Sequence, residues 1–282
     1  MNRNTKIQWT DMTWNPIIGC HKISPGCENC YAEKMANRIS HMDTWIGEQY
    51  REVIGLDGKW NWETHVADSH MDFPKIKKPK RVFVGSMTDI FFHSQRAEGR
   101  VDITRLFSVF AQHPQHTFQI LTKRPVEMNL FLKALRDITE SKVLKDTWKW
   151  PLPNVWLGVT VCNQEEANFK IPILLDTPAA KRFISIEPML GPIDLSYMPD
   201  KNWVMNAFTG ISTYPTGSII HNNLDWIIVG AETGQKARPI EHNWVAVLAR
   251  QAQLNKIPLF FKSWGKNDIH DWRIEALKQF PV

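Results

Sequence analysis

Residues 20–30 of the chain read Cys20-His21-Lys22-Ile23-Ser24-Pro25-Gly26-Cys27-Glu28-Asn29-Cys30 and hold three of the four cysteines. Segment 13–19 before them is typical of a short strand that runs into a loop, and segment 31–38 after them is typical of a helix. The three thiols therefore share a strand-to-helix loop, and its Pro25-Gly26 turn lets them converge. Three thiolates without a fourth match a cluster with one open coordination position better than a closed tetrahedral zinc site.

Three interpretations of this loop stay open. The first is a [4Fe–4S] cluster with one free iron, since such clusters are held by Cys thiolates, usually four. The second is a zinc ion completed by His21 or a distant group, and the third is a set of reduced structural cysteines. A cluster that lacks its fourth protein ligand implies an exogenous ligand on the open iron. The chemistry that uses such a site is reductive cleavage of S-adenosylmethionine to a radical.

Length and composition limit the class of protein. The chain has 282 residues, 43% of them hydrophobic, which fits a single α/β barrel domain over residues 1–282. No signal peptide and no apolar run long enough to cross a membrane is present, so we expect a soluble cytoplasmic protein. Three clustered cysteines plus the distant Cys162 do not indicate a disulfide framework. The net charge of +5 permits nucleic-acid binding without establishing it.

Segment 43–80 differs from its surroundings and is interpreted as an insertion after the first helix. It carries Trp45, Trp60 and Trp62, and the basic run 75–81 closes it. We expect Trp45–Val53 to be helical and the rest to be loop. The insertion is either a solvated basic linker or a substrate-facing flap that contacts phosphates.

From residue 81 onward, apolar segments typical of buried strands alternate with helical segments. The expected strands are 81–87, 116–122, 155–161, 181–187, 225–230 and 257–262, and the expected helices are 101–113, 125–138, 164–175 and 241–255. A polar connection, 142–153, separates two of these units. Such alternation predicts a parallel sheet, and six or seven units indicate a complete or partial barrel.

Polar groups appear where each apolar strand ends, and catalytic residues of parallel barrels concentrate at these ends. Each group taken alone fits an ordinary loop residue or helix cap equally well. A buried carboxylate needs a partner, which cationic side chains and a bound ligand can supply. The strand-end groups are Ser86, Thr88 and Asp89, then Lys123 and Arg124, then Thr160 and Cys162, then Glu187, then Glu232 with Arg238 beyond it, and finally Lys262.

Several segments, in order along the chain, carry a resemblance to a known family. They are 13–16, 20–32, 82–89, 121–125, 156–161, 184–193, 229–234 and 260–265. On these residues the chain resembles the phage-type radical S-adenosylmethionine family, whose members carry a three-cysteine motif and are mostly of undefined function. The wider superfamily more often spaces its cysteines C-x₃-C-x₂-C, whereas six residues separate Cys20 from Cys27 here.

The resemblance implies a partial (β/α)₆ barrel with a [4Fe–4S] cluster on Cys20, Cys27 and Cys30 at its mouth. It also implies S-adenosylmethionine as cofactor. The cofactor-binding candidates are Ser86, Thr88 and Asp89 near the methionyl ammonium, Lys123 or Arg124 near the carboxylate, Glu187 or Thr160 near the ribose, Tyr31 near the adenine, and Glu232. Cys162 is either a hydrogen-atom donor or a small buried residue.

The resemblance further implies a reaction. A 5′-deoxyadenosyl radical would abstract hydrogen from a substrate carbon, with an electron donor as partner. The setting of the relatives suggests that an isomerase or mutase rearranges an amino-acid-substituted thymine in phage DNA hypermodification. Its partner would be DNA or a modified nucleobase, flipped out if it lies in a duplex, in the host cytoplasm if the chain is phage-encoded. The alternative is a non-catalytic nucleic-acid-binding protein with a structural metal at the cysteine loop.

Overall fold

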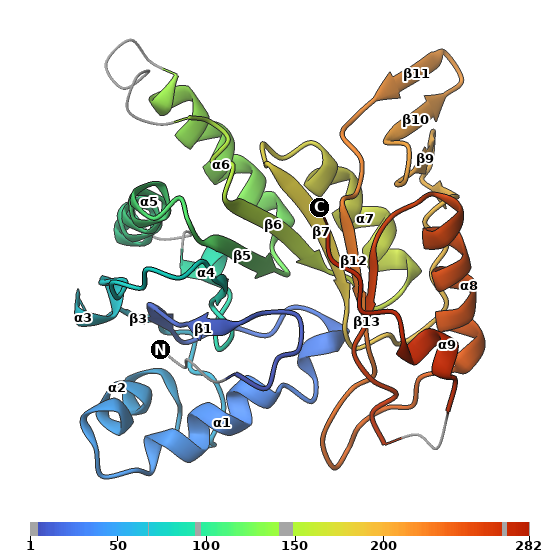
Figure 1. The fold of residues 1–282 in the computed structure, drawn as a ribbon. Helices are drawn as coiled ribbons and strands as arrows, with labels where there is room; N and C mark the ends of the chain where they lie inside the picture. Colours follow the sequence, from blue (N-terminus) through green and yellow to red (C-terminus); the bar gives the residue numbers. More distant parts are fainter. Residues whose placement is uncertain (1–4, 67, 94–96, 141–148, 267–269, 282) are drawn as a thin grey trace. The chain divides into compact units, whose positions relative to one another are not determined.

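The computed structural model describes residues 5–66, 68–93, 97–140, 149–266 and 270–281 (Figure 1). The chain divides into two compact units. The first comprises Met1–Trp156 with Pro178–Ala180, and the second comprises Leu157–Thr177 with Lys181–Val282. Most of the predicted connection 142–153 lies outside the described residues.

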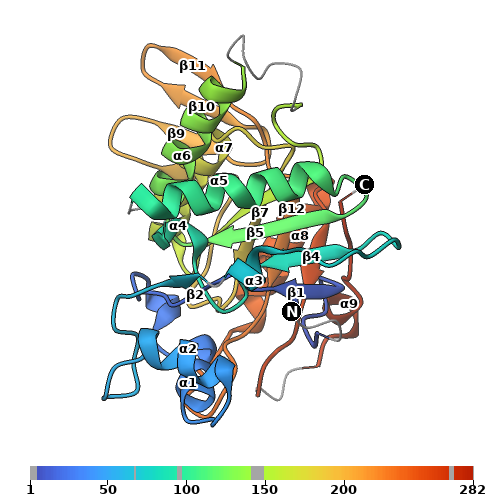
Figure 2. The same cartoon turned by 90° about the vertical axis from the view of Figure 1, so that its left-hand side faces the viewer.

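In the first unit, three parallel strands lie side by side in the order β1 (Met12–Trp14), β4 (Arg81–Val84) and β5 (Thr117–Thr122) (Figure 2). Residue Phe83 of β4 is in register with Thr13 on one side and Gln119 on the other. The helices α4 (Ile90–His93), α5 (Ala97–Gln112) and α6 (Pro125–Thr139) follow these strands along the chain. Rings of β1, β5 and α5 pack together and make an aromatic core on one face of the sheet.

The cysteine loop and the insertion form the other part of the first unit. Strand β2 (Ile17–Ile18) precedes the cysteine loop, residues 20–30. The loop contains a 3-10 turn, η1 (Pro25–Cys27), and leads into α1 (Tyr31–Ser40). The insertion supplies α2 (Trp45–Val53), β3 (His65–Val66) and α3 (Asp68–Met71). The predicted helix is confirmed, but the prediction that the rest is loop is wrong. A strand of two residues such as β3 is too short to show a periodic pattern of apolar residues. Its partner β2 also lies far away in the sequence, so no local hairpin signal marks it.

The second unit contains a parallel sheet in the order β6 (Val155–Thr160), β7 (Lys181–Ile186), β12 (Trp226–Val229) and β13 (Leu259–Phe261), with most of β6 in this unit. Strand β12 is in register with β7 and β13, and all four of its residues are buried. Burial on both faces is typical of parallel strands that helices cover. The helices here are α7 (Gln164–Leu175), α8 (His242–Leu254) and α9 (Trp272–Glu275).

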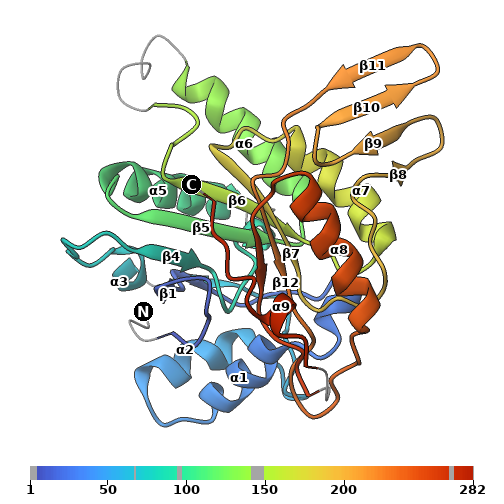
Figure 3. The same cartoon turned by 45° about the vertical axis from the view of Figure 1, so that its right-hand side comes forward.

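A four-stranded antiparallel sheet lies between β7 and β12 in sequence and was not predicted. Its order is β11 (Gly217–Ile220), β10 (Ile211–Tyr214), β9 (Val204–Asn206) and β8 (Met198–Pro199), as Figure 3 shows in orange and yellow. These strands are short, and every residue of β11 is exposed. Exposed strands lack the alternation of apolar and polar residues by which a half-buried strand is recognised.

The predicted α/β class and the parallel strand-helix order are therefore confirmed. Each predicted strand from residue 81 onward is present, and each is shorter than expected by at least one residue. None of the helices in the described part of the chain has both the length and the apolar character that a membrane crossing requires.

Candidate functional site

The cysteine loop is ordered by local hydrogen bonds. The Ser24 hydroxyl caps η1 by accepting a hydrogen bond from the Gly26 N–H at 3.2 Å, and the Cys27 N–H donates to the Ser24 carbonyl at 2.8 Å. Cys30 is the N-cap residue of α1. All three loop cysteines are free thiols, with Cys27 buried and the other two half-buried. The loop thus presents three thiols within one tightly turned segment.

An apolar cluster surrounds two of these thiols. Cys20 and Cys30 pack against it, and its buried members are Ile18, Ala32, Ala36, Tyr50, Val53, Ile54, Trp60 and Met87. Burial, together with the nearby Asp89 carboxylate, raises the pKa of the Cys20 thiol to about 12. Because only the thiolate binds metals, loading a metal here would have to displace a proton.

The loop cysteines are the candidate ligands for an iron–sulfur cluster. Among the described residues, no three His, Cys, Asp or Glu side chains already form a group that could hold a metal ion. The chemistry of the donors nevertheless fits, because Cys thiolates are the ligands of such clusters, and here three thiols share one loop beside an apolar cluster. Cys20, Cys27 and Cys30 are therefore the residues that would hold one.

Asp89 is the hub that joins two strand ends in the first unit. Its side chain is buried, and each carboxylate oxygen accepts two hydrogen bonds. Oδ1 accepts from the Thr122 hydroxyl at 2.7 Å and the Phe91 N–H at 3.2 Å. Oδ2 accepts from the Lys123 N–H at 2.8 Å and from Arg124 Nη1 at 3.5 Å. Asp89 therefore has its charge compensated within the protein.

Arg124 links this hub to the cysteine loop. Its side chain is only 3% exposed, and its Nη2 donates to the His21 carbonyl at 3.1 Å. The guanidinium also lies over the Phe92 ring, 4.8 Å from its centroid. The buried pair of Arg124 and Asp89 thus fixes the backbone beside Cys20 to the ends of β4 and β5. The half-buried Lys123 contributes its backbone N–H to the same hub.

The turn after β4 is tied to the loop by three further residues. The Tyr31 hydroxyl donates to the Ser86 carbonyl, and the Thr88 hydroxyl donates to the Gly19 carbonyl. Asn15 Oδ1 accepts from the Ser86 hydroxyl and the Met87 N–H, both at 3.1 Å. The structure therefore brings the predicted residues Tyr31, Ser86, Thr88, Asp89 and Arg124 together around Cys20.

Asn15 was missed as a site residue, although its sequence position offered one signal. It directly follows β1, so it lies at the end of a strand, as the predicted site residues do.

The predicted site residues of the second unit lie where its strands end. Glu187, directly after β7, forms an ion pair with Lys262, directly after β13. Glu232 is buried and holds Arg238 with two side-chain hydrogen bonds, of 2.5 Å and 2.9 Å. The half-buried Glu187 and the buried Glu232 thus both have cationic partners in this chain, and a buried charge such as that of Glu232 requires one.

A buried ion pair fixes Cys162 at the end of β6. Lys170 Nζ donates to Glu166 Oε1 at 2.7 Å and to the Thr160 carbonyl at 3.1 Å. Glu166 Oε2 accepts from the Cys162 N–H at 2.8 Å, and the Leu190 N–H donates to the Cys162 carbonyl at 2.8 Å. Cys162 is fully buried, as one of its two interpretations expected.

Glu166 and Lys170 were also missed. Their spacing of four residues within the predicted helix, with Glu preceding Lys, was an available signal for an ion pair.

The tryptophans of the insertion have different environments. Trp60 is buried in the apolar cluster, and its backbone N–H donates to Glu33 Oε2 at 3.3 Å. Trp62 is 58% exposed and stacks on the His21 ring, with 3.1 Å between ring centroids and 28° between planes. Burial and the nearby Arg124 lower the pKa of His21. One of the two rings therefore faces solvent beside the cysteine loop.

The basic run 75–81 lies at the opposite end of β4 from the cysteine loop, as its sequence position predicted. Arg81 is bound to Asp11, with Nη2 and Oδ1 3.1 Å apart. Lys75, Lys77 and Lys78 are exposed.

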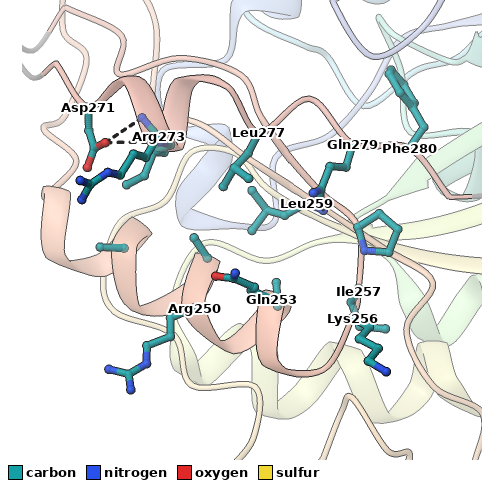
Figure 4. Close-up of a pocket in the computed structure, with 15 residues that line it drawn as sticks. Arg250, Gln253, Lys256, Ile257, Leu259, Asp271, Arg273, Leu277, Gln279 and Phe280 are labelled. Atoms are coloured by element: carbon teal, nitrogen blue, oxygen red, sulfur yellow. Dashed lines mark hydrogen bonds between the residues drawn. The ribbon is translucent and has the colours of Figure 1, made fainter.

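A hollow of about 930 Å³ lies elsewhere, in the second unit between α8 and segment 271–280 (Figure 4). Leu259, Ile274, Leu277 and Phe280 line it with apolar surface, and Asp271 accepts a hydrogen bond from the Arg273 N–H at 3.0 Å. None of the residues predicted for the site is among those that line this hollow. It is therefore a different place on the molecule.

The fold and these residues define an α/β protein with parallel strands and a three-thiol loop anchored where two strands end. The chain belongs to the family described as "Protein of unknown function (DUF5131)", whose model matches residues 4–279. No curated protein matches the chain, and no solved structure matches it. The family gives no activity, so a function has to be argued from the residues.

Proposed function

We propose that this chain is a radical S-adenosylmethionine enzyme whose cysteine loop carries a [4Fe–4S] cluster. The observation that carries the proposal is the loop itself. Three thiols lie on one loop, and the loop is bound to the ends of β4 and β5 through Arg124 and Asp89. Catalytic groups at the carboxyl ends of parallel strands are the rule in α/β barrels.

The strand-helix order of the two units is compatible with one partial (β/α)₆ barrel, and the proposal includes that architecture. In it, the three loop cysteines bind the cluster and leave one iron open. When bound, the cluster supplies the electron that cleaves S-adenosylmethionine reductively.

The residues of the first unit have distinct roles in this proposal. Asp89 is a positioning residue, because four donors of the protein already occupy its oxygens. Arg124 fixes the backbone beside Cys20. The groups that face a ligand are the exposed Tyr31 and the half-buried Ser86 and Lys123. In the second unit, Glu187 and Glu232 are ligand candidates together with their cationic partners.

The substrate in this proposal is an amino-acid-substituted thymine of phage DNA, rearranged by an isomerase or mutase reaction. This part rests on the resemblance described above. The basic composition, with a net charge of +5, is compatible with a nucleic-acid partner. The protein's contribution is to orient the substrate carbon and to exclude water, and an external donor provides the electron.

Anaerobic reconstitution with iron and sulfide tests the proposal. We expect a brown protein that absorbs near ~400 nm, about four irons for each chain, and formation of 5′-deoxyadenosine from S-adenosylmethionine after reduction. Replacement of Cys20, Cys27 or Cys30 by Ala should abolish iron binding, whereas Cys162→Ala should retain it. A colourless protein with one zinc for each chain would contradict the proposal and support the structural-metal alternative.

A further inference from the structure

The backbone at Trp62 is in an unusual conformation. Its φ is +71°, in the left-handed region that bulky side chains avoid. A residue persists in such a conformation only when the surrounding structure fixes it, and such residues cluster at functional sites and ligand clamps.

Segment 61–64 is held from several sides. The Asn61 N–H donates to the Val53 carbonyl at 3.2 Å, and the Asn61 side chain bridges the Glu52 carbonyl at 2.8 Å and the Glu63 N–H at 3.0 Å. The Thr64 hydroxyl lies 2.6 Å from His93 Nδ1. These bonds fix the backbone on both sides of Trp62.

The segment packs directly against Gly19, the residue before Cys20. His93, the partner of Thr64, is buried and is itself held by Asp102, 2.9 Å from its Nε2. A Cβ added to Gly19 would lie only 2.2 Å from the Glu63 carbonyl oxygen, which shows how closely the two segments pack. Hydrogen bonds and close packing therefore hold the backbone of segment 61–64 in this strained conformation.

These contacts hold the indole ring of Trp62 in one position. Trp62 is 58% exposed, and it stacks on His21, the residue next to Cys20. The His21 backbone is fixed in turn by Arg124. Trp60, two positions earlier, is buried and anchors the segment instead. The strained backbone therefore displays a flat aromatic surface beside the three thiols.

We propose that Trp62 is a stacking platform that binds an unpaired nucleobase beside the cysteine loop. A rigid indole face is complementary to a planar conjugated ring, and every nucleobase has such a face. The net charge of the chain, +5, is compatible with a ligand that carries phosphate. This inference rests on the proposed function, because it adds a binding surface for the substrate beside the proposed cluster. Binding of a nucleobase to Trp62 is tested separately from the cluster.

The experiment uses reconstituted protein and a fluorescently labelled single-stranded oligothymidylate, with affinity measured by anisotropy. We expect Trp62→Ala to weaken binding by about 5- to 150-fold, the equivalent of the 1–3 kcal/mol of base stacking. Trp62→Phe should retain most of the affinity. The matched control is Trp45→Ala, because Trp45 is 60% exposed in the same unit but packs near His70 instead of His21.

Three results with the variants would overturn the platform. They are an unchanged affinity in Trp62→Ala, an equal loss in Trp45→Ala, and a loss of S-adenosylmethionine affinity in calorimetry without a loss of oligothymidylate affinity. Absence of oligothymidylate binding by the unsubstituted protein would overturn it as well. Iron content and 5′-deoxyadenosine formation are measured on the same samples. A failed platform with an intact cluster is therefore distinguished from a failed cluster.

Discussion

Asp89 is a strand-end carboxylate whose hydrogen bonds are made within the protein. Its oxygens accept from Thr122, Phe91, Lys123 and Arg124, and the contact with a methionyl ammonium that its sequence position suggests stays a prediction. The sequence could predict that a carboxylate stands here. It could not predict the partner, because Arg124 lies one strand-helix unit later in the chain.

Replacing Asp89 by Asn should therefore destabilise the protein. The amide would leave the buried Arg124 without its counter-charge, and breaking a buried pair costs about 3–5 kcal/mol. Urea denaturation followed by circular dichroism measures the free energy of unfolding. The control is Asp57→Asn, since Asp57 is exposed in its pair with Lys59 and should contribute at most ~1 kcal/mol. Equal stability of the two variants would contradict the role assigned to Asp89.

His116 makes the stability depend on pH. Its Nδ1 accepts from the Lys80 N–H at 3.1 Å and its Nε2 lies 3.0 Å from the Ile76 carbonyl, so the folded protein holds it neutral. Burial lowers the pKa of His116 below its usual 6.5, the hydrogen bond to Ile76 opposes this, and His113 adds to it. The unfolded chain therefore binds the proton first as the pH falls.

The stability that neutral His116 contributes should be fully present above about pH 6.5 and be lost as the pH falls from there toward the folded pKa. Urea denaturation at pH values of about 7.5 and about 5.5 checks this. The free energy of unfolding should fall more steeply in the natural protein than in His116→Gln, whose side chain does not titrate. The same pH dependence in both proteins would exclude His116 as the cause.

At the scale of the element, the sequence predicts long or buried helices and strands better than short, exposed ones. The helix Gln164–Leu175 has the predicted bounds, and the sequence marks its start, because Asn163 caps it by accepting a hydrogen bond from the Glu166 N–H. Strands β8–β11 were missed because they are short and mostly exposed, although each pairs with its neighbour in the sequence. Strand β3 was missed because it has two residues and pairs with β2, which lies far away in the chain. The cysteine loop was found from its residue types, whereas its coupling to segment 61–64 depends on tertiary packing alone.

The close packing of β6 against β7 gives a prediction for Gly158. A Cβ at this position would lie 2.5 Å from the Phe183 ring, which is buried and has no room to turn away. We expect Gly158→Ala to lower the free energy of unfolding by about 1–3 kcal/mol through overpacking. Gly191→Ala, where no atom lies within 4 Å, is the control. Adding Phe183→Leu should recover part of the loss, and a purely additive double variant would argue against the steric cause.

At the scale of the whole molecule, the charged surface and the thiol loop are separated along the strands of the first unit. Lys75, Lys77 and Lys78 precede β4, whereas the cysteine loop is bound to the residues that follow it. A basic run at the far end of the sheet favours the interpretation of a solvated linker over that of a phosphate-binding flap.

Replacing these three lysines by Gln should accordingly leave the salt dependence of oligothymidylate binding unchanged. Removing one ion pair between a lysine and a phosphate of a single strand would flatten the slope of log affinity against log salt by about 0.7. Anisotropy titrations at several salt concentrations measure that slope. A decrease of about 2 in the variant would mean that the run does bind phosphates.

Gly19 constrains how related chains can vary. Its φ of +92° and its approach to the Glu63 carbonyl leave no space for any side chain while segment 61–64 is in place. Two positions that lie far apart in the sequence must therefore change together. A relative that keeps this insertion has to keep glycine here, and one that carries alanine or serine must route the insertion differently. Position 19 thus serves as a marker by which aligned family members can be sorted before any of their structures is known.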